Sequence, residues 1–252
     1  MINTRFSCVG CGKCCNDHHV PLTLAESRQW AADGGTVIIL VEAFLENGHG
    51  VPALQFEHAR RRSTKVPSGT THAWLAVTFA AYNKGPCRNL DADNRCAIYE
   101  RRPLVCRIYP AEINPHIPLR PGMKDCPPES WEQGTPLIVG GQLVDSELAT
   151  LIERSRQADR DDIQQKAAIC TRLGIRTTAL KGDGFATYLP DMQGFIAAAN
   201  EVCDSPQAAP DNTPWGFQLA NPSTARILLE HGAALSQPDD ERYAFIPLQI
   251  QD

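Results

Sequence analysis

The chain has 252 residues, with 24 Lys and Arg against 29 Asp and Glu, and it contains ten cysteines. Its length and its hydrophobic fraction of 42% indicate a globular protein with a buried core, in one large domain or two modest ones. The net charge of −5 argues against nonspecific nucleic-acid binding, and the apolar runs are far shorter than the roughly 20 residues of a membrane helix.

The start of the chain has no apolar segment of the kind that a signal peptide requires. We therefore expect a cytoplasmic protein. In a reducing cytosol, ten cysteines indicate metal ligation or redox chemistry and not a disulfide framework.

The first half of the chain predicts loops around two strands and one helix. Residues 6–20, with two glycines among four cysteines, predict a ligand loop. Thr23 and Glu26 have the spacing of a capping box, which predicts a helix over Thr23–Ala32. Residues 49–71 are polar and predict mostly loop. Two apolar runs predict strands, at Val37–Phe44 and Trp74–Ala81.

A short helix is expected between Pro103 and Pro110, with Cys106 in its first turn. Because a helix N-terminus favours a thiolate, we expect a lowered pKa for Cys106. Residues 110–136 are rich in proline and predict an irregular segment, which carries Cys126.

The second half of the chain predicts mainly helices. Residues 185–189 predict one short strand, and Ser205–Pro214 predicts a linker. Amphipathic patterns predict helices at Ser146–Gln157, Arg160–Leu173, Asp191–Val202 and Thr224–His231.

Eight of the ten cysteines lie in the first 126 residues: Cys8, Cys11, Cys14, Cys15, Cys87, Cys96, Cys106 and Cys126. Thiolates select zinc, copper(I) or iron–sulfur clusters over hard cations. Three of them form a C-x2-C-x2-C run like that of a ferredoxin, whose fourth ligand comes from a distant Cys-Pro such as Cys126-Pro127. A zinc finger fits less well, because its second half needs another closely spaced pair.

The adjacent pair Cys14–Cys15 bears on the number of centres. Neighbouring side chains diverge, so we expect that the two do not easily serve one mononuclear ion. Either two centres exist, or a multinuclear cluster accepts both, or one cysteine is structural. Eight cysteines suffice for two sites of four thiolates, in a pairing that stays open. His18 and His19 could ligate or hydrogen-bond to a sulfur, although the cysteines already suffice.

The two remaining cysteines, Cys170 and Cys203, stand alone in the second half. Cys170 lies in an apolar helical pattern, which predicts a small core residue.

At this point the chain resembles a known family. The segment Phe6-Ser-Cys8-Val-Gly-Cys11-Gly-Lys-Cys14-Cys15 and the later segment from Cys96 to Pro110 are similar to the YkgJ-type cysteine-cluster family, described as zinc- or iron-chelating. The resemblance covers roughly residues 6–127 and implies that all eight cysteines are metal ligands. The same domain occurs in flagellin lysine methylases, with an iron–sulfur cluster and S-adenosylmethionine. A long segment between the motif halves and a distinct C-terminal region depart from that pattern, so methylase activity is not carried over.

Together these patterns predict an α+β protein. An irregular, cysteine-rich, metal-centred domain is expected at residues 1–135, and a mainly helical region at residues 136–252. The predicted function is a cytoplasmic metal-binding protein that holds an iron–sulfur cluster, of the [4Fe–4S] type, or zinc, for redox or electron-transfer purposes. The alternatives are a cluster-dependent modifying enzyme such as a protein methyltransferase, and a structural zinc module for protein interaction. No motif for S-adenosylmethionine supports the enzyme. The expected partner is an unidentified protein or substrate, and not a nucleic acid or a membrane.

Overall fold

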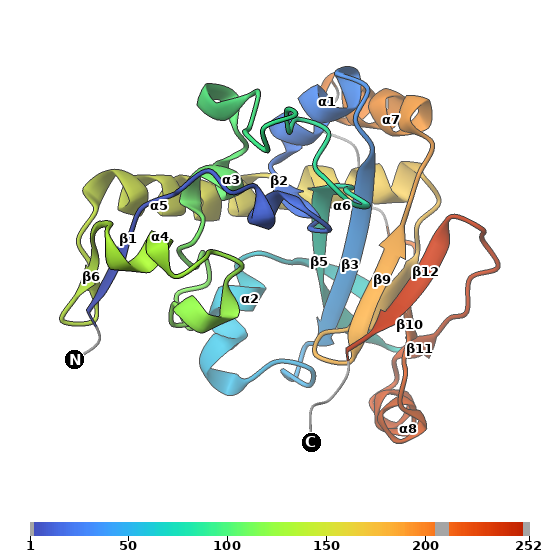
Figure 1. Ribbon diagram of the computed structural model, residues 1–252. Helices are drawn as coiled ribbons and strands as arrows, with labels where there is room; N and C mark the ends of the chain where they lie inside the picture. Colours follow the sequence, from blue (N-terminus) through green and yellow to red (C-terminus); the bar gives the residue numbers. More distant parts are fainter. Residues whose placement is uncertain (1–2, 205–211, 249–252) are drawn as a thin grey trace. The chain divides into compact units, whose positions relative to one another are not determined.

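A computed structural model describes residues 3–204 and 212–248 (Figure 1). The chain forms two compact units, and each is built from two separate segments. The first unit combines Met1–Leu22 with Tyr82–Ala158, and the second combines Thr23–Ala81 with Asp159–Asp252. The boundary expected at residue 135 falls at the first residue of strand β6 (Thr135–Val139), within the first unit.

The second unit is built on a mixed sheet whose central strand is β3 (Val37–Leu45). β3 pairs antiparallel with β5 (Thr71–Ala81) in a register that sets Val41 opposite Val77. Most of β3 is buried, as in a strand that is covered on both faces. The other strands are β4 (Thr64–Ser68) beside β5, β8 (Thr177–Leu180) and β9 (Gly184–Tyr188) beside β3, β10 (Gly216–Gln218) beside β8, β11 (Ala234–Leu235) beside β10, and β12 (Tyr243–Pro247) beside β9.

Helices supply the rest of this unit's core. Phe79 of β5 packs edge-on against Phe195 of a helix, with ring centroids 5.2 Å apart, and both side chains are fully buried. Ile169 and Cys170 are also fully buried, which confirms Cys170 as a core residue. The helices of this unit are α1 (Leu24–Ala32), α2 (Phe56–Arg60), α6 (Ile163–Arg172), α7 (Met192–Asp204) and α8 (Pro222–Glu230), with a 3-10 turn, η2 (Ala53–Gln55).

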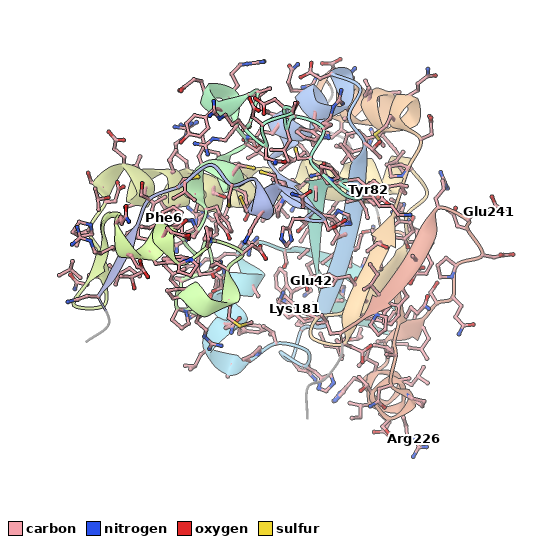
Figure 2. The ribbon with its side chains drawn as sticks, in the orientation of Figure 1. Phe6, Glu42, Tyr82, Lys181, Arg226 and Glu241 are labelled. Carbon is pink, nitrogen blue, oxygen red and sulfur yellow. The ribbon has the colours of Figure 1, made fainter. Side chains whose placement is uncertain are left out.

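One ion pair joins two neighbouring strands of this sheet. Figure 2 labels Glu42 of β3 and Lys181, which directly follows β8, and the lysine ammonium contacts the glutamate carboxylate. Both side chains are largely buried within the unit.

The first unit has a smaller core around less regular structure. A three-stranded sheet runs in the order β1 (Thr4–Phe6), β6, β7 (Gln142–Leu143). The further elements are η1 (Lys13–Cys15), β2 (Val20–Leu22), η3 (Tyr99–Arg101), α3 (Leu104–Ile108), η4 (Pro121–Met123), α4 (Glu129–Glu132) and the start of α5 (Ser146–Asp161). Its buried hydrophobic cluster consists of Leu104, Ile108, Leu137, Leu148 and Ile152.

The observed elements confirm the α+β class and the helices expected in the second half. Two expectations were wrong. The segment 49–71 holds α2 and β4, and the second half holds several strands instead of one. The missed strands are short and acquire their structure from partners far away in the sequence, which local patterns do not reveal. Of the expected linker at 205–214, residues 205–211 lie outside the described residues. Within the described ranges, no helix is long and apolar enough to span a membrane.

The capping box at α1 is confirmed in both directions. The Thr23 hydroxyl accepts from the Glu26 backbone N–H at 3.1 Å, and the Glu26 carboxylate accepts from the Thr23 N–H at 2.9 Å. We expect Thr23→Ala to lower the free energy of unfolding by about 1 kcal/mol, because an N–H at the helix start loses its acceptor. Urea denaturation measures this. Glu26→Gln keeps an oxygen acceptor and serves as the control, and equal losses in the two variants would contradict the prediction.

Candidate metal centre

The N-terminal ligand loop makes its tightest turn at Gly12, just before η1. Gly12 has φ +70°, and a Cβ atom there would lie 2.9 Å from the backbone oxygen of Asn94. A side chain at this position would therefore meet both backbone strain and a clash. The turn sets the following cysteines, Cys14 and Cys15, in one 3-10 helix, where both are half-buried.

Backbone hydrogen bonds hold the end of this loop against the segment around Cys87. The Cys87 N–H donates to the Cys15 carbonyl at 2.7 Å, and the Asp17 N–H donates to the Gly85 carbonyl at 2.8 Å. The Asp17 carboxylate accepts from the Gly85 N–H in return. Cys15 and Cys87 are thus neighbours although 71 residues separate them in the chain.

A turn brings Cys96 back to the same place. The Leu90 N–H donates to the Cys87 carbonyl at 3.0 Å, and Leu90 forms an isolated bridge with Cys96. The Asp91 carboxylate closes the turn by accepting from the Asp93 and Arg95 N–H groups. This carboxylate is therefore used in shaping the loop.

Helix α3 carries Cys106 between two core residues, Leu104 and Ile108. The sequence predicts Pro103 at the first helical position, and the structure has it one residue earlier, as the N-cap residue. The expected low pKa is wrong: burial, reinforced by the charges of Cys15 and Cys87, raises the pKa of Cys106 to about 12. α3 has only five residues, so its N-terminal field is weak beside the cost of burying a thiolate.

The segment around Cys126 is held against the start of the ligand loop. The Trp131 indole N–H donates to the Cys126 carbonyl at 3.4 Å, and its ring packs on Phe6 at 5.0 Å between centroids. The Ser7 N–H donates to the Ser130 carbonyl at 2.8 Å. These contacts place Cys8, which follows Ser7, close to the Cys126 segment; Figure 2 labels Phe6 at this point of the first unit.

The backbone contacts above, together with the charges that shift the thiol pKa values, are the basis on which we sort the eight cysteines into two candidate groups. A hydrogen bond with Cys15 is the largest effect that raises the pKa of Cys14, and burial is the next. The charges of Cys15, Cys126 and Cys8 raise it further. Burial raises the pKa of Cys126, and the charges of Cys11 and Cys8 add to it. We call this set group A: Cys8, Cys11, Cys14 and Cys126.

The other four thiols interact with one another in the same way. The charges of Cys15, Cys87 and Cys96 all raise the pKa of Cys106, after burial. Burial also raises the pKa of Cys87, where Cys15 and Cys96 contribute again. We call this set group B: Cys15, Cys87, Cys96 and Cys106.

The two groups meet at the adjacent pair Cys14–Cys15, whose sulfur atoms lie 3.9 Å apart. The expected divergence of these side chains is therefore wrong for the sulfurs, because a single χ1 rotation of each short side chain suffices to bring them together. The hydrogen bond from Cys14 lowers the pKa of Cys15 to about 6, and the charges of Arg102 and His18 act in the same direction.

Arg102 is fixed beside group B by its neighbour Tyr99. Its guanidinium stacks 3.7 Å from the centre of the Tyr99 ring, and its Nε–H donates to the Tyr99 carbonyl at 2.9 Å. Its charge lowers the pKa values of Cys15 and Cys106, although other effects outweigh it at Cys106. An arginine held in this way offsets the negative charge of a thiolate site.

His18 and His19, at the end of the ligand loop, have partners other than the cysteines. His18 Nε2 lies 2.9 Å from a carboxylate oxygen of Asp125, and His19 Nδ1 accepts from the Asn83 N–H at 3.4 Å. Burial, followed by the charge of His18, lowers the pKa of His19. The possibility that either histidine ligates a metal stays a prediction. Sequence reasoning missed Asp125, whose position directly before Cys126 was its only signal.

All ten cysteines are free thiols. Among residues 3–204 and 212–248, no three histidine, cysteine or carboxylate side chains form a ready-made metal site. The donor chemistry nevertheless fits a thiophilic metal, since eight cysteines lie in the first unit and no disulfide uses any of them. Cys203, on α7 of the second unit, belongs to neither group.

Comparison with known proteins gives one match. Residues 7–124 match the sequence model of the CxxCxxCC family, described as "Putative zinc- or iron-chelating domain". Neither a curated protein nor a solved structure matches the chain.

Proposed function

We infer, from the match of residues 7–124 to the sequence model of the CxxCxxCC zinc- or iron-chelating domain, that this chain is a metal-binding protein whose eight N-terminal cysteines are the ligands. We assign these ligands to two centres, one on group A and one on group B. The observation that supports the assignment is the pair of backbone contacts that hold Cys15 against Cys87, at 2.7 Å, and Ser7, the residue before Cys8, against Ser130 of the Cys126 segment, at 2.8 Å.

For group A we propose a [4Fe–4S] cluster. Its members are a C-x2-C-x2-C run and Cys126, which precedes Pro127, and this is the ligand pattern of ferredoxin-type clusters. The contacts between Ser7 and Ser130, and between Trp131 and Cys126, support it because they hold the distant cysteine near the run. Group B supplies four further thiolates for a second centre of the same ligand class.

Redox or electron-transfer work is the use that we propose for these centres. A bound iron–sulfur cluster supplies one-electron chemistry, and the protein tunes it through charge, burial and hydrogen bonds at the sulfurs. The chain's own contributions are the Arg102 charge beside Cys15 and the burial of Cys106. A cytoplasmic location fits ten free thiols, since a reducing compartment preserves them.

The first experiment measures iron, zinc and acid-labile sulfide in protein purified without oxygen. The proposal expects at least about four iron and four sulfide per chain with a broad absorption band near roughly 400 nm. Zinc without sulfide or colour would overturn the iron–sulfur assignment and leave the two-centre assignment to the variants below. Absence of both metals would overturn the metal-binding proposal.

Adjacent cysteines give the sharpest test of the two-centre assignment. Cys14→Ala and Cys126→Ala should lose the same metal, and the double variant should lose no more than either single variant. Cys15→Ala should instead lose the metal that Cys106→Ala loses. Cys203→Ala, which lies outside both groups, is the control with full metal content. If Cys14→Ala and Cys15→Ala lose the same metal, the division into groups A and B is wrong.

A further inference from the structure

The Tyr109 hydroxyl lies beside a proposed ligand of group A. Its oxygen accepts a hydrogen bond from the free Cys126 thiol at 3.5 Å and another from the Asp125 N–H at 3.3 Å. The Asp125 N–H thus uses one lone pair of the Tyr109 oxygen. The hydroxyl proton of Tyr109 stays available for donation to another acceptor. A metal-bound thiolate carries no proton and can only accept, so the bond to Cys126 then runs from oxygen to sulfur.

Several contacts hold this arrangement in place. The Tyr109 N–H donates to the Val105 carbonyl at the end of α3. The Lys124 ammonium lies 5.5 Å from the centre of the Tyr109 ring and is itself held at 2.7 Å by the Glu112 carboxylate.

Asp125, the donor to the hydroxyl, is fixed through its side chain. Its carboxylate lies 2.9 Å from the His18 ring nitrogen, and His18 belongs to the ligand loop at residues 6–20. Tyr109 is therefore aimed at the sulfur by the two segments that also carry the group A cysteines.

We propose that Tyr109 is a positioning residue for group A, which orients the Cys126 sulfur and limits the electron density that this sulfur gives to a bound metal. A hydrogen bond to a thiolate ligand withdraws charge from it, and this favours the more negative, reduced state of a cluster. The inference rests on the proposed function, because it takes Cys126 as a ligand.

The test compares Tyr109→Phe with Tyr243→Phe in the anaerobically purified full-length protein. Tyr109→Phe keeps the ring and removes the hydroxyl. Tyr243→Phe makes the same change in the second unit, where the hydroxyl donates to the Gln218 side chain at 2.6 Å. For Tyr109→Phe we expect reduction of the group A centre to become about threefold to tenfold less favourable, a shift of about 30–60 mV to lower potential at 59 mV per tenfold. Tyr243→Phe should leave this potential unchanged.

Cobalt(II) substitution supplies a second measurement, which also applies if the centre is mononuclear. Removing the hydroxyl should move the thiolate-to-cobalt charge-transfer band to longer wavelength in Tyr109→Phe only. If both variants bind metal like the natural chain and neither potential nor band moves, Tyr109 has no such role while the metal site stands. Absence of any bound metal from the natural chain would overturn both proposals.

Discussion

Removing the metal should unfold the first unit and leave the second folded. The first unit buries only five core hydrophobic residues in its cluster, and much of its remaining chain is turns and short helices. The thiols of both groups also repel one another once they are ionised, and a bound cation offsets this repulsion. Metal binding in such domains supplies folding free energy on the order of 10 kcal/mol, which exceeds what a small core contributes.

The second unit has no comparable dependence on a metal. Phe79 and Phe195 are fully buried within it, and its central strand β3 is paired on both sides. We therefore expect amide protons of β3 and β5 to stay protected from hydrogen exchange in the metal-free chain. Amides of residues 86–108, including those of α3, should lose protection.

Hydrogen exchange read by mass spectrometry, before and after treatment with a chelator under reducing conditions, measures both regions in one sample. Restoring the metal should restore the protection, which serves as the control against irreversible damage. If residues 86–108 keep their protection without metal, the first unit folds on its core alone and the metal is not a structural element of it.

The sequence predicted the local features of this protein better than its long-range organisation. The capping box at Thr23, the strand at Val37 and the short helix that carries Cys106 all follow from nearby residues, and all are confirmed. The discontinuous units do not follow from nearby residues. Strand pairing between β3 and β8 joins residues more than 130 positions apart, and no local pattern specifies that partner.

At the candidate site, too, the sequence predicted local features better than long-range organisation. The eight cysteines could be named from their spacing, but their two groups could not, because membership depends on which loops the backbone joins. The Cys15 carbonyl accepts from the Cys87 N–H, whereas the charge of Cys126 raises the pKa of Cys14, the preceding residue. The pKa of Cys106 was mispredicted for a related reason, since its burial arises from the fold around α3 and not from its helix position.

Core and metal site should be energetically coupled through α3. Ile108 is 1% exposed and lies two residues after Cys106 on this short helix. Ile108→Ala should cost about 2–5 kcal/mol, the usual loss for such a truncation in a core. If the first unit folds only with metal, this loss of stability also weakens metal binding. A loss of about 2 kcal/mol corresponds to an affinity for the metal that is about 30-fold lower.

A matched substitution in the second unit separates this coupling from general destabilisation. Ile169 of α6 is fully buried, so Ile169→Ala removes the same atoms from a core that contains neither cysteine group. It should lower thermal stability by a similar amount while the chain retains its metal. Competition with a graded series of chelator concentrations measures retention in both variants. Equal retention in Ile108→Ala and Ile169→Ala would mean that α3 holds Cys106 without help from the core, because the metal site would then be insensitive to the packing beneath it.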